Sequence, residues 1–181
     1  MKAKRVALCA VLIAMALGLS YMERFIPLNL LVPLPGVKLG LANIVTLTAL
    51  YFLNGRTAFT VLVLRCFLNA LFGGGVSGLA FSLTGGVLAL GVMFLARKLP
   101  FLSVYGVSVL GAAAHNMGQI LAAMLLFKSA YVAAYLPFLL AVSLVTGMVT
   151  GTACAGCFRA LSAAGWTPWE RKEHCYAGTS R

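Results

Sequence analysis

The chain has 181 residues, of which 62% are hydrophobic and only 9% are charged. Soluble domains carry roughly 25% charged residues, so this composition excludes an ordinary soluble protein and predicts an all-α, polytopic bundle of membrane helices. The formal net charge of +11 does not call for nucleic acid as a partner, because most basic residues stand at the ends of apolar stretches, where membrane topology explains them.

Residues that hold metals or carry acid–base chemistry are scarce. The only acids are Glu23, Glu170 and Glu173, and none of them lies in the middle of an apolar stretch. This argues against a carboxylate-bound metal centre and against a proton relay of buried carboxylates. Cys154 and Cys157 have the spacing of a redox or metal motif, but no second pair accompanies them. We therefore predict no catalytic residue, no metal and no cofactor.

The first apolar stretch runs from Val6 to Met22 and predicts a membrane helix. Small side chains recur along one side of it in steps of three and four, and we refer to them as the small-residue stripe: Ala7, Ala10, Ala14 and Gly18. Small residues let another helix approach closely. That helix belongs either to the same chain or to a separate subunit, and the sequence leaves both alternatives open.

The segment from Glu23 to Leu39 contains Pro27, Pro33 and Pro35, which preclude a continuous helix. We expect a loop or a short re-entrant segment on the outer face, placed to act as a lid. The apolar stretch that follows, Gly40 to Leu53, is short for a membrane span unless it begins within the loop.

The third apolar stretch, Thr57 to Phe72, carries Arg65 and Asn69 one helical turn apart. A guanidinium does not lose its proton in proteins, and an arginine at mid-membrane costs at least about 2.5 kcal/mol. Arg65 lies roughly half-way along the stretch, which disfavours snorkelling to an interface. It therefore needs backbone carbonyls, water or an anion.

A glycine-rich turn, Gly73 to Gly78, separates this stretch from the next one, Leu79 to Ala96. The turn lacks the preceding strand and the following lysine of a phosphate-binding loop, so a tight extracellular hairpin is the better interpretation. The last apolar stretch runs from Val132 to Phe158, with Pro137 marking a kink or a late start.

The apolar stretch from Val104 to Phe127 carries three polar side chains near its centre, His115, Asn116 and Gln119. His115 and Gln119 are one turn apart and share a face of the helix. Polar groups at this depth need partners, so we expect them to face a protein interior or a polar cavity rather than lipid. Two interpretations stay open: the residues form one wall of a binding cavity, or they only tie helices together.

Basic residues favour one side of the membrane. Lys4, Arg56, Lys98 and Arg159 all fall on the side of the N-terminus, and the positive-inside rule makes this side cytoplasmic. We therefore expect a multi-pass protein of the cell membrane with about six spans and both termini in the cytoplasm. The predicted organisation is a transmembrane domain over residues 1–161 and a polar, basic cytoplasmic tail over residues 162–181.

The polar residues of these stretches lead to one hypothesis about a ligand. We predict that six side chains converge on a substrate-binding pocket open to the outside: Asn43, Arg65, Asn69, His115, Asn116 and Gln119. Because we expect no buried acid beside Arg65, a small-molecule ligand with a carboxylate or phosphate would supply the missing anion. In the alternative, backbone carbonyls and water satisfy Arg65, and the pocket is small and dry.

Two segments carry a resemblance to a known family, Pro35-Gly-Val-Lys-Leu-Gly-Leu-Ala-Asn43 and His115-Asn-Met-Gly-Gln119. With the six short spans and the proline-rich first loop, they resemble the Gx transporter family, also named heptaprenyl diphosphate synthase component I. That family in turn resembles the substrate-binding S components of energy-coupling factor (ECF) transporters. The resemblance covers Ala3 to Leu161.

The resemblance to S components implies a transport function. An S component binds a small vitamin-like or anionic molecule from outside and reorients in the lipid bilayer when partner ATPase subunits act through a coupling transmembrane subunit. In these proteins an Ala-x-x-x-Ala motif on the first helix contacts the coupling subunit, and the matching positions here are Ala10 and Ala14. The chain has no phosphate-binding loop of its own, so the resemblance places ATP hydrolysis on a partner.

The synthase name implies a different function. Prenyl transfer needs acidic clusters to hold magnesium and diphosphate, and three scattered acids do not supply them. Under that name the chain would be a non-catalytic subunit of heptaprenyl diphosphate synthase in isoprenoid quinone biosynthesis. A third alternative is a membrane partner in quinone- or flavin-linked electron transfer, although the sequence has neither a haem-ligand pair nor a flavin motif.

Overall fold

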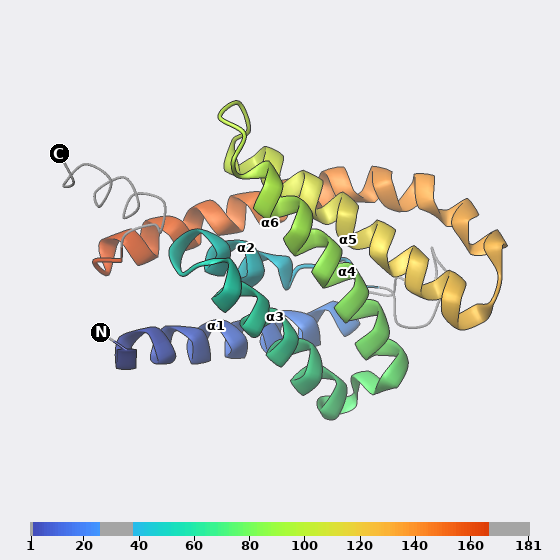
Figure 1. Cartoon of the computed structure of the whole chain (residues 1–181), viewed down its shortest axis with the longest axis horizontal. Helices are drawn as coiled ribbons and strands as arrows, with labels where there is room; N and C mark the ends of the chain where they lie inside the picture. The colour runs from blue at the N-terminus through green and yellow to red at the C-terminus, as the bar shows by residue number, and fades with distance from the viewer. Residues whose placement is uncertain (1, 26–37, 167–181) are drawn as a thin grey trace.

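The computed structural model describes residues 2–25 and 38–166, and every regular element within those two ranges is a helix (Figure 1). The elements are α1 (Lys2–Met22), η1 (Glu23–Phe25), α2 (Asn43–Phe52), α3 (Gly55–Asn69), η3 (Ala70–Gly74), α4 (Gly75–Ala96), α5 (Val104–Phe127), η4 (Ala130–Tyr135) and α6 (Leu136–Ala163). Most of the predicted lid, including its three prolines, and most of the predicted tail lie outside the described residues.

Four segments are long and apolar enough to cross a membrane: Ala3–Met22, Gly55–Ala96, Val104–Phe127 and Ala130–Ala163. The second of them contains two helices, α3 and α4, which reverse direction at Gly73, where φ is +93°. The predicted span at Gly40 to Leu53 is realised as α2, which has only ten residues. Such a helix is roughly 15 Å long, about half the thickness of the hydrocarbon core. The chain is thus an all-helical protein with the apolar helices of a membrane protein.

Local sequence signals set the helix ends. Asn54 caps α3 by accepting a hydrogen bond from the backbone N–H of Thr57 at 2.7 Å. Ser103 begins α5 in the same way. Pro137 stands in the first turn of α6, where its missing N–H is tolerated, so it marks a late start rather than a kink.

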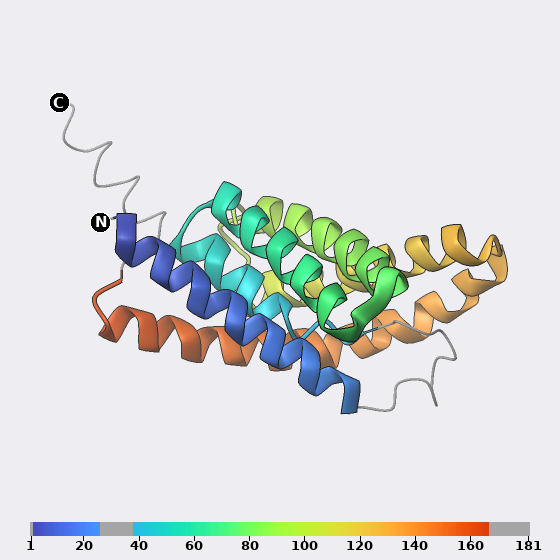
Figure 2. The ribbon, with the colours of Figure 1, turned by 90° about the horizontal axis from the view of Figure 1, so that it is seen from below.

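Figure 1 shows α5 between α4 and α6, and Figure 2 shows α1 lying along the outside of the bundle, where it packs on α2 and α3. Glycines allow the closest contacts. A Cβ added to Gly118 of α5 would lie 2.7 Å from the Cα atom of Gly85 in α4. One added to Gly147 of α6 would lie 2.5 Å from the Cα atom of Val109 in α5. The three helices therefore touch backbone to backbone, as small residues permit in membrane proteins.

The cysteine at position 154 has a packing role. Cys154 is fully buried, and its Sγ atom lies 3.3 Å from the carbonyl oxygen of Ile44, to which it donates, and 3.8 Å from the hydroxyl of Thr48. This contact joins α6 to α2. Cys154 is thus a buried packing residue on one face of α6 and is not part of an exposed pair of thiols.

We predict that Gly118→Ala destabilises the protein by about 1–3 kcal/mol, because the new methyl group overlaps the backbone of α4. Gly156→Ala is the matched control, since a Cβ there meets nothing within 4 Å and alanine is the better helix former. Thermal unfolding of the detergent-solubilised protein measures both changes. Equal unfolding temperatures for the two variants would contradict the close contact.

Candidate functional site

Charged and polar side chains from five parts of the chain gather inside the bundle. We refer to them as the polar cluster: Glu23, Lys38, Asn43, Arg65, His115 and Gln119. They come from η1, the segment before α2, α2, α3 and α5. All except the half-buried Lys38 are almost fully buried. Four of the six are residues that the sequence predicted for a substrate pocket.

Gln119 links the segment before α2 to the cluster. Its Oε1 atom accepts a hydrogen bond from the backbone N–H of Lys38 at 3.1 Å, and its Nε2 atom donates to the carbonyl oxygen of Lys38 at 2.9 Å. This reciprocal pair fixes which end of the amide is the nitrogen. The same Nε2 lies 2.7 Å from Nε2 of His115. An amide nitrogen only donates, so His115 Nε2 accepts, and the neutral ring carries its proton on Nδ1.

Glycines let the other members come close to His115. Gly40 has φ +83°, a left-handed conformation that favours glycine. A Cβ on Gly40 would lie 2.9 Å from Cδ2 of His115 and 3.1 Å from Nδ2 of Asn43. On the other side, a Cβ on Gly85 would lie 2.9 Å from Nδ1 of His115. The imidazole of His115 therefore lies between two glycines, Gly40 and Gly85, where any larger residue would overlap it.

Arg65 is only 5% exposed, as its position half-way along an apolar stretch predicted. Its Nη2 atom lies 3.4 Å from the position that a Cβ on Gly86 would take, so the guanidinium runs along α4. Neither Nε nor Nη2 has a hydrogen-bond partner among the described residues. The guanidinium thus does not snorkel to a surface.

The expectation that no acid is buried near Arg65 is wrong. Glu23 is only 4% exposed and accepts a short hydrogen bond from the backbone N–H of Leu41. Burial raises the pKa of Glu23, and the Leu41 N–H and the charges of Lys38 and Arg65 offset part of that rise. This burial could not be predicted from the sequence, because Glu23 stands just after the first apolar stretch, where an acid is normally exposed to water.

Several buried polar atoms of the cluster have no hydrogen-bond partner within residues 2–25 and 38–166. They are Oδ1 and Nδ2 of Asn43 and Nε and Nη2 of Arg65, whereas Nδ1 of His115 faces the backbone of Gly85. A buried polar group without a hydrogen bond lowers stability by roughly 1–3 kcal/mol. Several such groups close together are unusual in a folded protein. The atoms of Asn43 and Arg65 include both donors and an acceptor, and they belong to two different helices.

Two of the six predicted site residues are used elsewhere. Asn116 donates from Nδ2 to the carbonyl oxygen of Leu139 in α6 at 2.8 Å, which ties α5 to α6. The side-chain amide of Asn69 packs against the turn after α3, with Nδ2 3.2 Å from the position that a Cβ on Gly74 would take. For Asn116 the interpretation as a tie between helices fits the geometry.

The small-residue stripe faces away from the bundle. Ala7, Ala10, Ala14 and Gly18 are all exposed, and a Cβ on Gly18 would meet nothing within 4 Å. The opposite face of α1 is the buried one, with Leu12 and Ala16 in the core. Of the two predicted alternatives, an internal neighbour is thus excluded among the described residues, and a separate molecule or lipid stays open.

The sequence model of a family described as heptaprenyl diphosphate synthase component I matches residues 12–156. The chain belongs to this family. No curated protein and no solved structure matches the chain. All six members of the polar cluster lie within the part that the component I family model covers, and so do Ala14 and Gly18 of the stripe.

We predict a pH-dependent difference between the parent protein and Glu23→Gln. Because burial raises the pKa of Glu23 in the folded state, the acid's contribution to stability is fully present below its ordinary pKa of 4.5 and is lost as the pH rises through the folded value. The neutral glutamine keeps an acceptor for Leu41 and has no such dependence. Thermal unfolding between about pH 4 and 8 tests this, and parallel curves for the two proteins would refute it.

Proposed function

We propose that this protein is the membrane-embedded substrate-binding component of an ECF-type transporter and that the polar cluster binds an anionic small molecule. The observation that carries the proposal is the set of unpartnered buried atoms on Asn43 and Arg65, beside His115 and Gln119. A ligand with acceptors and donors of its own would meet them, and exclusion of water would strengthen each contact. Asn69 and Asn116 stay outside the proposed contact set because of the contacts that they make elsewhere.

The charge of the cluster supports an anionic ligand. Lys38 and Arg65 bring two positive charges, Glu23 brings at most one negative charge, and His115 is neutral by its hydrogen bond to Gln119. The cluster therefore keeps a positive excess whether Glu23 is ionised or protonated. A carboxylate or phosphate would balance that excess through a charge-assisted pair with the guanidinium.

The exposed small-residue stripe supports a partner in the membrane. Close approach of two helices needs small residues on the contact face, and the exposed face of α1 is centred on them. The same helix leads directly into Glu23 of the polar cluster. We propose that a coupling transmembrane subunit docks on this face and that ATPase subunits act through it.

A second candidate function rests on the family description, which names one component of a synthase. In that case the chain is a non-catalytic membrane subunit that binds a prenyltransferase. Its only acid in the described ranges is Glu23, whereas a magnesium-bound diphosphate calls for several carboxylates. Both candidates need a protein partner, and the identity of that partner separates them.

We predict that the parent protein co-purifies with a membrane subunit and ATPases, and that Ala10→Trp or Ala14→Trp reduces the recovery of these partners at least ten-fold because the indole blocks close helix contact. Val149→Trp, on an exposed face of α6, is the control and should leave recovery unchanged. Mass spectrometry of the purified complexes identifies the partners. A soluble prenyltransferase in place of ATPases would support the second candidate, and full recovery with both α1 variants would exclude the stripe as the docking face.

We predict that Arg65→Met and Gln119→Leu lose an anionic small molecule that the parent protein retains. Arg65→Met removes the charge that balances the anion, and Gln119→Leu removes the anchor of Lys38 and His115. The measurement is mass spectrometry of small molecules released by denaturing the purified proteins, with Arg159→Gln as a charge-matched control. Equal amounts of the same molecule from all four proteins would place the ligand elsewhere.

A further inference from the structure

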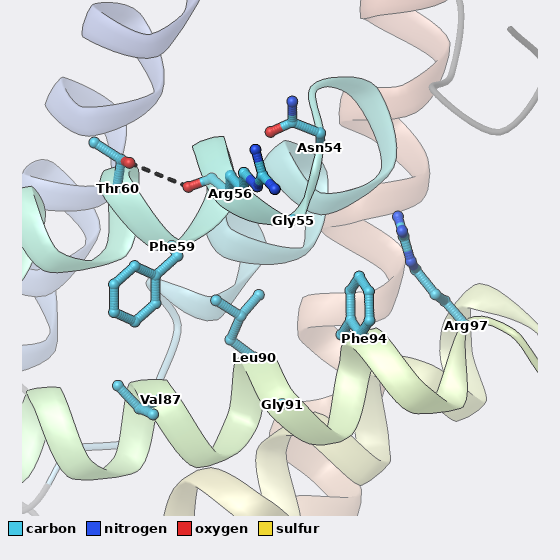
Figure 3. A pocket seen from close by; sticks show the side chains of 10 residues that line it. All are labelled: Asn54, Gly55, Arg56, Phe59, Thr60, Val87, Leu90, Gly91, Phe94 and Arg97. Atoms are coloured by element: carbon cyan, nitrogen blue, oxygen red, sulfur yellow. Dashed lines mark hydrogen bonds between the residues drawn. The ribbon is translucent and has the colours of Figure 1, made fainter. Parts of the chain in front are cut away.

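A second site lies between α3 and α4. A pocket of about 970 Å³ opens there, at the upper end of the size range of small-molecule sites (Figure 3). Its lining combines apolar side chains with two arginines: Asn54, Gly55, Arg56, Phe59, Thr60, Val87, Leu90, Gly91, Phe94 and Arg97. None of these residues belongs to the polar cluster.

The pocket has an apolar floor and a basic rim. Phe59 comes from α3, and Val87, Leu90 and Phe94 follow one face of α4, as Figure 3 shows. Gly91 lies among them, and a Cβ there would meet nothing within 4 Å, so the glycine leaves the groove open at its centre. Arg56 and Arg97 stand where α3 begins and α4 ends.

The rim is built to hold positive charge. Arg97 donates from Nη1 to the carbonyl oxygen of Leu50 at 2.7 Å, and its guanidinium lies 4.9 Å from the ring centre of Phe94. Lys98 stacks on the same ring at 4.8 Å. The N-terminal end of α3, which carries a partial positive charge, opens on the same space. The only acid in the described ranges, Glu23, does not line the pocket.

The pocket opens on the outer surface of the bundle, on a segment that a bilayer could surround. It lies on the segment Gly55–Ala96, which is long and apolar enough to cross a bilayer. Phe59 and Val87 are 48% and 41% exposed, so the apolar floor continues onto the surface of the bundle. The arginines stand at helix ends, where the headgroups of a bilayer lie. Shape and charge are complementary to a phosphate headgroup with an acyl chain.

We propose that this pocket binds an anionic phospholipid of the surrounding bilayer, with its phosphate at Arg56 and Arg97 and one acyl chain in the groove over Gly91. The lipid fills the space between the splayed ends of α3 and α4 and neutralises the basic rim. This site is independent of the ligand proposed for the polar cluster, so either assignment stands without the other.

Native mass spectrometry of the detergent-solubilised chain tests the site. Equal amounts of phosphatidylglycerol and phosphatidylcholine are added, and the parent protein should retain at least five-fold more phosphatidylglycerol. Gly91→Leu, which fills the groove, and Arg56→Gln, which removes an exposed charge, should each lower this retention at least five-fold. Gly156→Leu and Arg159→Gln are matched controls on α6 and should retain the parental amount.

Three results would overturn the proposal. One is equal retention of the two lipids by the parent protein, and another is parental retention by both pocket variants. The third is displacement of phosphatidylglycerol by stoichiometric farnesyl diphosphate that depends on Arg56, because the pocket would then take a prenyl diphosphate rather than a bilayer lipid. Arg56→Gln keeps the test valid if Gly91→Leu fails to fold, since Arg56 is an exposed residue in the first turn of α3.

Discussion

The buried guanidinium of Arg65 is the constraint on which the arrangement of the bundle depends. It does not give up its charge, and it lies in an apolar helix with almost no exposure. Its surroundings are adapted to that charge: Gly86 provides room along α4, and Glu23 is buried within range of its field. Glu23 in turn holds the segment before α2 through Leu41. One unavoidable charge thus organises parts of four elements.

Two kinds of interface hold the molecule together. Helices α4, α5 and α6 touch through glycines at distances that no side chain would permit, so their relative positions have little freedom. By contrast, the segment before α2 is held to α5 by the hydrogen bonds between Lys38 and Gln119. Hydrogen bonds of this kind contribute about 0.5–1.5 kcal/mol each and break at less cost than packed backbone contacts. The segment is therefore held to α5 less firmly than α4, α5 and α6 are held to one another.

Much of the architecture could be predicted from the sequence, because apolar length fixes membrane helices directly. The burial of Arg65 and the polar face of His115 and Gln119 followed from the cost of polar groups at mid-span. Glu23 and Lys38 could not be found in this way, since both stand outside the apolar stretches, where exposure is the default. For Asn116 and Asn69 the sequence predicted burial but not the direction of the side chain. The depth of a polar residue follows from its place in an apolar stretch, whereas its direction depends on the neighbouring helices.

The contacts also connect the polar cluster to the exposed face of α1. A ligand that met Asn43, Arg65 and His115 would lie beside Gln119, which holds Lys38. Lys38 is three residues from Leu41, whose N–H binds Glu23 at the end of α1. A shift of the Lys38 segment therefore changes the surroundings of the residue that follows α1, whose outer face carries the small-residue stripe. These hydrogen bonds form a physical route from the polar cluster to the end of α1, where Glu23 follows the helix that carries the stripe.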